Sequence, residues 1–174
     1  GIDTRAYVTG RNGEITHVPQ RDRVYNQQTG EAIARQFRRF NVVLSTNLVA
    51  FCLFRHLRES NPDADLYRLL RTAGSAGTGI EFGQLCARVQ RVLDALRALA
   101  DSDGVLLHET VRDEDASQVI ADALRHFGSY HETHVMVRRG DRIFAEDMNL
   151  LFYYHNRLTG YGLETVGRAV REVA

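Results

Sequence analysis

The sequence predicts an α+β domain that is predominantly α-helical. Apolar residues recur at helical spacing in several stretches, and the longest of these runs from about 81 to 101. A shorter stretch alternates around Arg139-Gly140, as the two strands of a β-hairpin do. We therefore expect helices packed around the 81–101 helix, with a small hairpin at about 133–145.

Composition restricts the class of protein. The chain has 174 residues, of which 44% are hydrophobic, and this is enough to build a core at that size. Its 22 basic residues are all arginine and are balanced by 22 acidic residues, so the formal net charge is zero. A dedicated nucleic-acid binder usually carries a basic excess, so no nucleic-acid partner is expected.

The first 21 residues differ from the rest of the chain. They contain Gly10, Gly13 and Pro19 and show no sustained period, which predicts a linker or irregular arm over 1–21. Residues 22–174 are expected to form one helical α+β domain. The chain opens on Gly1 in polar sequence, so we expect it to be part of a longer protein.

The sequence of the first half of the domain predicts three helices. Ile33, Phe37 and Phe40 indicate a helix through about Phe40, and an extended link follows. Ser45 or Thr46 is expected to cap a second helix that runs to about Glu59 and ends before Asn61-Pro62. This helix should bury Leu48, Val49, Cys52, Leu53 and Leu57, and the short third helix carries Leu66, Leu69 and Leu70.

A glycine-rich connection at Ala73–Gly79 precedes the best-defined helix. Thr78 and Glu81 have the spacing of a capping box at its start. The apolar stripe that follows alternates by three and four residues, which places it on one face of the helix. Its members are Phe82, Leu85, Val89, Val92, Leu96 and Leu99.

The second half predicts a strand, a helix, the hairpin and a closing helix. "VLL" at 105–107 indicates the strand, and Asp113 is expected to cap a helix that ends at Gly128. Asp147 is expected to cap the closing helix. On that helix Leu151, Tyr154, Leu158 and Tyr161 share one face, which should pack inward, whereas Tyr153, Asn156 and Arg157 lie off it.

Three patterns suggest chemistry, and each has a simpler interpretation. Cys52 and Cys86 lie in apolar surroundings, as buried free thiols in a reducing compartment do. His131 and His134, with His126 upstream, could hold zinc, but solvent-facing histidines also explain them. "GSAGTG" lacks the lysine of a phosphate-binding loop and is read as a linker. No metal ligand set or cofactor is therefore expected.

Two stretches have the spacing His-x4-Asp, namely His17 with Asp22 and His108 with Asp113. An aspartate can orient a histidine that removes the proton from a substrate hydroxyl. With 7 histidines and 12 aspartates in 174 residues, 7 × 12/174 gives about 0.5 matches by chance. A small hydrolase or acyltransferase that uses His108 and Asp113 is therefore the weakest of the three functional hypotheses, and the other two are given below.

Three segments together resemble the glycerol-3-phosphate acyltransferase family over about 41–162. "NVVLSTNLVAFCLFRHLRE" is similar to the segment that follows the family's catalytic core, and "EFGQLCARVQRVLDALRALADSDG" is similar to its next long helix. "LLFYYHNRLTGYG" resembles the carboxy-terminal Tyr-Arg-Asn segment, on which Tyr154, His155 and Asn156 fall. His155 replaces the arginine, and the family's catalytic signatures are absent from the sequence.

The resemblance implies a non-catalytic carboxy-terminal domain that scaffolds or regulates such an enzyme. The full enzyme would transfer a fatty acyl group from a thioester to glycerol 3-phosphate in phospholipid biosynthesis. Its partners would be the catalytic domain of the same protein and a membrane surface. The full-length protein is expected at the cytoplasmic face of the membrane, and this part of it is expected to be soluble.

Two interpretations of the closing helix stay open. Its polar and aromatic residues could form a docking surface for the catalytic domain, a partner or lipid headgroups, or they could simply border the core. The candidate docking residues are Tyr153, Tyr154, His155, Asn156 and Arg157. The alternative function is a winged-helix-like module that binds nucleic acid or protein, because helices followed by a hairpin can produce that shape.

Overall fold

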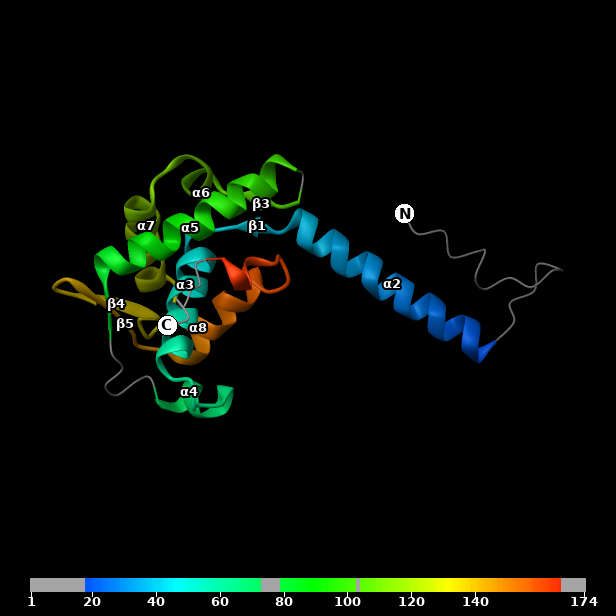
Figure 1. Ribbon diagram of the computed structural model, residues 1–174, viewed down its shortest axis with the longest axis horizontal. Coiled ribbons are helices and arrows are strands. Elements are labelled where there is room, and N and C mark those ends of the chain that lie inside the picture. Colours follow the sequence, from blue (N-terminus) through cyan, green and yellow to red (C-terminus); the bar gives the residue numbers. More distant parts are fainter. Residues whose placement is uncertain (1–17, 73–78, 103, 167–174) are drawn as a thin grey trace, which may run out of the picture. The chain divides into compact units, whose positions relative to one another are not determined.

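The computed structural model describes residues 18–72, 79–102 and 104–166 (Figure 1). The chain divides into two compact units, residues 1–41 and 42–174. The first unit contributes the helix α2 (Pro19–Phe40), which begins inside the stretch expected to be irregular. Pro19 occupies the first turn of α2, where its missing N–H costs no helical hydrogen bond. Residues 1–17 of the expected arm lie outside the described range.

The second unit is an α+β domain that is predominantly helical, which confirms the predicted fold class. Its elements are β1 (Val42–Val43), α3 (Ser45–Ser60), α4 (Leu66–Thr72), β2 (Ile80–Glu81), α5 (Phe82–Asp101), β3 (Leu106–Leu107), α6 (Glu109–Asp113), α7 (Ala116–Ser129), β4 (Met136–Arg139), β5 (Arg142–Ala145), α8 (Met148–His155) and the short 3-10 helices η1 (Asn156–Leu158) and η2 (Leu163–Thr165). Among the described helices, none has the length and apolar character required to cross a bilayer.

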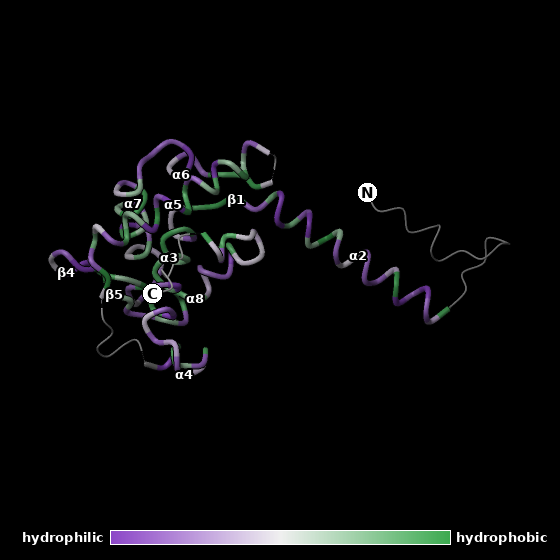
Figure 2. The backbone as a smooth tube through the Cα atoms, in the orientation of Figure 1, coloured by the Kyte–Doolittle hydropathy of each residue, from purple (hydrophilic) through white to green (hydrophobic). Residues whose placement is uncertain are grey.

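The core of this unit is centred on α3, which packs against α5, α7 and α8. Figure 1 shows α3 between α5 and α8, and Figure 2 shows hydrophobic residues along its length. Most of its side chains are buried because three helices cover it, and they include all five residues expected there. α5 buries the central part of the predicted stripe, and Val92 and Leu96 are core residues as expected. Phe82 and Leu99, at the two ends of the stripe, are partly buried.

Two small sheets complete the unit. β1 and β3 pair in parallel, with Val42 opposite Leu106. β2, β5 and β4 form an antiparallel sheet in that order, and the β4–β5 turn has Gly140 at a positive φ of 62°. The hairpin was predicted, but the pairing of Ile80 with Ile143 joins two stretches whose proximity no local pattern indicates.

The start of α5 differs from the prediction. Glu81 lies in β2 and is the N-cap residue of α5, so it cannot close a capping box as the third helical residue. The hairpin replaces this cap, because the Phe82 N–H donates to the Asp141 carbonyl at 2.8 Å. Thr78, the other half of the expected box, lies outside the described residues, as does the connection at 73–78.

Two other predicted caps are wrong for a local reason. Leu44, which lies between β1 and Ser45, is the N-cap residue of α3, and the Asn47 carboxamide oxygen accepts from the Leu44 N–H at 3.1 Å. Asp113 ends α6 instead of starting α7, because the chain turns at Glu114 between the two helices. Asp115 is the cap of α7, and that helix continues through Gly128 to Ser129.

Candidate functional site

The closing helix is positioned by Asp147, as predicted. Its Oδ1 accepts from the N–H groups of Asn149 and Leu150, each at 2.9 Å, and so satisfies amides of the first turn. Leu151 of α8 and Leu158 of η1, which follows directly, are fully buried. The expected inward face is therefore confirmed for both leucines, and Tyr154 and Tyr161 are partly buried beside them.

The five candidate docking residues fall into two groups. Tyr153 is 55% exposed, and Asn156 and Arg157 are also exposed. Tyr154 and His155 are partly buried and contact other side chains of the core. The surface part of the cluster is thus Tyr153 with Asn156 and Arg157, as the helical spacing of three and four residues predicts.

His155 lies against three phenylalanine rings. Its ring centroid is 4.6 Å from that of Phe54 and 5.2 Å from that of Phe51, whose plane is nearly parallel to the imidazole. Phe152 stacks on it at 5.7 Å, and the only polar partner recorded for the ring among the described residues is the Asn156 Oδ1, 3.2 Å from Nδ1. His155 therefore joins α3 to α8 through ring contacts.

Burial lowers the pKa of His155 below its usual range. The hydrogen bond with Asn156 raises this pKa, while Arg55 and Arg58 lower it further and Glu164 raises it. The imidazole is consequently neutral at neutral pH. The neutral ring lacks the positive charge and the forked donors with which an arginine at this position would bind an anion.

We expect acidification from about pH 7.5 to about pH 5 to destabilise the domain. The unfolded chain protonates His155 near its ordinary pKa of ~6.5, whereas the native state resists the proton, so the unfolded state binds more protons in this range. The contribution of neutral His155 to the free energy of unfolding is fully present above about pH 6.5 and is lost progressively below it. Urea unfolding at both pH values measures the difference.

His155→Phe should reduce this acid sensitivity, because it keeps an aromatic ring and removes the titrating group. Part of the sensitivity should remain, since burial also lowers the pKa of His56. The exposed His134 provides the control, and His134→Gln should behave as the unchanged protein does. An equal loss of stability on acidification in His155→Phe and the unchanged protein would contradict the assignment.

Tyr154 connects α8 to the end of α7. Its hydroxyl is 2.8 Å from His131 Nε2, and its ring meets Phe127 edge-on at 5.0 Å. Burial raises the pKa of Tyr154, and neighbouring Tyr153 and Tyr130 raise it further. The phenol therefore stays protonated and serves as a hydrogen-bonding group.

Around Tyr154 lies a surface of aromatic side chains, which we call the tyrosine surface. It consists of Tyr130, Tyr153 and Tyr154 with His126 and His131. Tyr130 is 74% exposed and stacks on His126, and Tyr153 meets Tyr154 edge-on at 5.4 Å. Rings with an apolar body and a polar tip are the side chains that most often anchor protein interfaces.

Sequence reasoning placed only two members of the tyrosine surface, Tyr153 and Tyr154, in the candidate site. Tyr130, His126 and His131 come from the end of α7 and the loop after it. The histidines were considered as zinc ligands, but across residues 18–72, 79–102 and 104–166 no three His, Cys, Asp or Glu side chains converge as a metal site would require. The signal available in the sequence was that Tyr130 lies next to His131 and four residues after His126.

The His108 and Asp113 pair is used for local structure. His108 is the N-cap of α6, and its Nδ1 accepts from the Thr110 N–H at 3.4 Å. The Asp113 carboxylate accepts two hydrogen bonds from Arg112, at 3.0 and 3.1 Å, and these hold the pKa of Asp113 below its usual range. The other His-x4-Asp candidate, His17 with Asp22, includes a histidine outside the described residues.

A partly buried polar contact joins the start of α3 to α7. The Ser45 hydroxyl donates to Asp122 Oδ2 at 2.6 Å, and Arg125 donates to the other carboxylate oxygen. Partial burial raises the pKa of Asp122, but the hydrogen bonds from Ser45 and Arg125 outweigh it and hold the pKa below its usual range. The negative charge also lies near the positive end of the α3 dipole.

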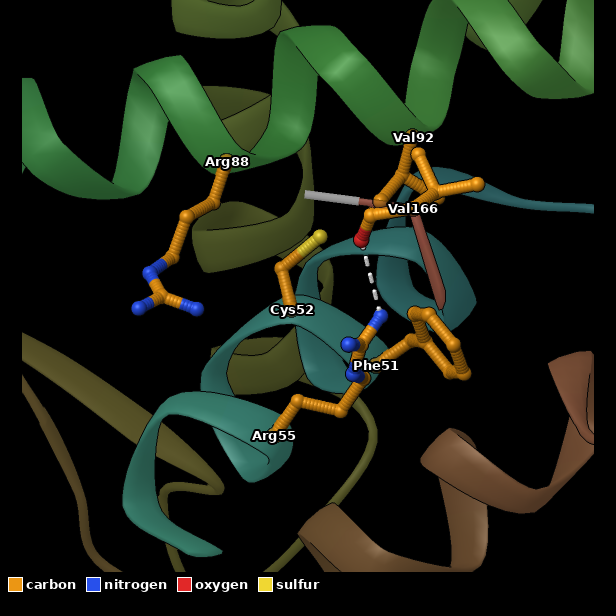
Figure 3. Close-up of a pocket in the computed structure, with 6 residues that line it drawn as sticks. All are labelled: Phe51, Cys52, Arg55, Arg88, Val92 and Val166. Carbon is orange, nitrogen blue, oxygen red and sulfur yellow. Dashed lines mark hydrogen bonds between the residues drawn. The ribbon is translucent and has the colours of Figure 1, made fainter. Parts of the chain in front are cut away.

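A shallow pocket that is open to solvent lies between α3 and α5 (Figure 3). Arg55 Nη1 donates to the carbonyls of Leu163 and Val166 at 2.8 and 3.0 Å, and Arg88 pairs with Glu59 at 2.8 Å. Burial raises the pKa of the Cys52 thiol to about 12, so it is not a nucleophile. Both arginines of this pocket thus serve the fold, and the tyrosine surface is the better candidate site.

Comparison of the chain with protein-family models, curated proteins and solved structures finds no match.

Proposed function

We propose that this chain is the non-catalytic, post-catalytic portion of a glycerol-3-phosphate acyltransferase. The full enzyme would transfer an acyl group from a thioester to the sn-1 hydroxyl of glycerol 3-phosphate at the cytoplasmic face of a membrane. In this proposal the domain scaffolds or regulates the catalytic domain and does not perform the transfer.

The supporting observation is the direct contact between segments that carry the resemblance. Phe51 of the first segment stacks on His155 of the third, and Phe54 contacts the same ring at a tilt with centroids 4.6 Å apart, although about a hundred residues separate the two segments in sequence. α5, which contains the second segment, packs on α3 as well. Similar segments that form one packed core are what a shared domain would require.

The tyrosine surface, extended by Asn156 and Arg157, is the proposed docking surface for the catalytic domain. Tyrosine and arginine are the residue types that dominate binding energy at protein interfaces, and Tyr130 and Tyr153 present large exposed rings. Their anchoring side chains are pre-positioned, because Tyr154 is held by His131 and Phe127. Little side-chain conformational freedom would therefore be lost by Tyr154 on docking.

Changing Tyr153 and Arg157 together to alanine should leave the stability of the domain nearly unchanged. Substitutions of exposed side chains usually alter the free energy of unfolding by no more than ~0.5 kcal/mol. The same double change should lower acyltransferase activity or membrane association of the full-length enzyme. A large loss of domain stability would show that both residues are structural and would end the docking proposal.

The isolated chain should not transfer acyl groups. Asp113 is bonded to Arg112 and His108 caps α6, so neither is arranged as an oriented base facing a substrate. Incubation with an acyl thioester and glycerol 3-phosphate should give only background turnover. Turnover above background that His108→Ala abolishes would instead assign a catalytic role to His108.

The function itself is tested by removing the stretch that encodes residues 42–174 from its gene. Membranes prepared from cells that carry the shortened gene should lose glycerol-3-phosphate-dependent acylation. Supplying the intact gene to the same cells should restore it. A variant gene that encodes Tyr153→Ala and Arg157→Ala should restore less activity with an unchanged amount of protein. Full acylation after the deletion would overturn the proposal.

The winged-helix alternative is favoured by one observation, which is the strand order. In the sheet, β5 lies between β2 and β4, and along the chain α5 and α7 lie between β2 and the β4–β5 hairpin. Both orders are those of a winged helix. β3 and α6 interrupt the chain order between the two helices. This topology is compatible with a protein-docking role on the same domain.

The arginines of the hairpin disfavour nucleic acid as the partner. Arg138 lies over the Phe82 ring at 4.1 Å, and Arg139 pairs with Glu146. Arg142 donates to the Gly79 carbonyl at 2.7 Å. A nucleic-acid reader would direct such residues to phosphates, and binding would weaken steeply with salt. Salt-dependent binding of a duplex, lost on Arg138→Ala, would reverse this preference.

A further inference from the structure

The helix α2 carries an apolar stripe that is open to solvent. Ile33, Phe37 and Phe40 are spaced by four and three residues, so they lie on one face of the helix. Their exposed fractions are 46%, 74% and 63%. Across Pro19–Phe40, all of which the structure describes, no side chain is buried. Two exposed phenylalanines on one helical face indicate a surface that is covered by a partner.

The same helix is basic, whereas the second unit is acidic. α2 has five arginines against Asp22 and Glu31, a formal charge of +3. The second unit, residues 42–174, has 15 arginines against 18 aspartates and glutamates, a formal charge of −3. The balanced charge of the whole chain therefore hides a separation of charge along it, which favours an anionic partner for α2.

Three of the arginines of α2 lie on a different face of the helix from the apolar stripe. At 100° per residue, Arg35, Arg38 and Arg39 fall on the face opposite Ile33 and Phe37. Their long side chains can extend from that face toward a surface on which the stripe rests. The Arg39 guanidinium already lies 5.8 Å from the centre of the Phe40 ring, at the border between the two faces. Figure 2 shows hydrophobic and hydrophilic residues alternating along α2.

We propose that α2 lies on the surface of an anionic lipid bilayer, with Phe37 and Phe40 at the boundary between headgroups and acyl chains. The arginines on the opposite face would then contact lipid phosphates around the helix. Aromatic residues on one face and arginine on the other are the features of helices that bind in the plane of a membrane. The bilayer accounts for both faces.

This inference deepens the membrane contact of the proposed function and rests on it for its biological setting. The binding itself needs no acyl transfer, so it can be measured on the chain as it exists. The purified chain is mixed with vesicles of phosphatidylcholine alone, or of phosphatidylcholine with phosphatidylglycerol, and the bound fraction is separated by sedimentation.

The unchanged chain should sediment with the anionic vesicles, less at high salt, and little with phosphatidylcholine alone. Phe37→Ala with Phe40→Ala should weaken binding about tenfold or more, because two apolar side chains no longer enter the interface. Alanine favours helix, so α2 should still form. Val24→Ala is the matched control, because Val24 is exposed on the same helix but lies away from the stripe, and it should bind as the unchanged chain does.

Absence of binding to anionic vesicles, or equal binding by the double variant, would overturn the proposal. Light scattering gives a second readout on the same samples. A dimer that dissociates in the double variant, without vesicle binding, would assign the stripe to a second copy of the chain and also overturn it. Neither result involves acylation, so failure here is distinct from failure of the gene-deletion experiment.

Discussion

Phe54→Ala is expected to lower the free energy of unfolding by about 3–5 kcal/mol, the usual range for truncation of a buried phenylalanine. Phe54 is almost fully buried in α3, where it contacts both Phe152 and His155. Its removal would leave a cavity at the junction of α3 with α8. Urea unfolding monitored by circular dichroism measures the change.

The exposed Tyr67 on α4 offers a matched control for loss of an aromatic ring. Tyr67 is 68% exposed, so Tyr67→Ala should alter the free energy of unfolding by no more than ~0.5 kcal/mol. If Phe54→Ala cost as little as Tyr67→Ala, the junction between α3 and α8 would not be the packed contact described here. The link between the resembling segments would then lose its support.

Leu96→Ala should cost about 2–5 kcal/mol of unfolding free energy. Leu96 is a fully buried member of the apolar stripe of α5, and the helix packs on α3 and α7. The same substitution at Leu106, which is 48% exposed on β3, is the control and should have a much smaller effect. A loss below about 1 kcal/mol for Leu96→Ala in urea would contradict the position of α5 in the core.

The elements that sequence analysis predicts well are those with a local cause. The stripe of α5 is a repeated pattern within one helix, and burial of Val92 and Leu96 follows from its period. Asp147 caps α8 because its carboxylate reaches amides two and three residues ahead, which is a contact within one turn. Such features need no knowledge of the rest of the chain.

Apart from the caps of α3 and α7, the features that sequence analysis misses depend on distant partners. β2 exists because Ile80 pairs with Ile143, and this pairing changes the start of α5. His155 is neutral because Phe51 and Phe54 of α3 surround it, and nothing near His155 in sequence indicates those rings. In the candidate site, Tyr153, Asn156 and Arg157 were correctly placed on the outside by spacing alone. The contribution of Tyr130 depends on how α7 meets α8.

The parallel pair of β1 and β3 has a consequence for the order of folding. Val42 and Leu106 are 64 positions apart, and their strands hold only two residues each. Closing so long a loop costs entropy before the few hydrogen bonds of the pair are gained. The helices between them contain local contacts and can form first. The Val43 carbonyl, which accepts from the His108 N–H at 3.0 Å, should therefore gain its partner late, and the amide of His108 should exchange with solvent sooner than those in the middle of α5.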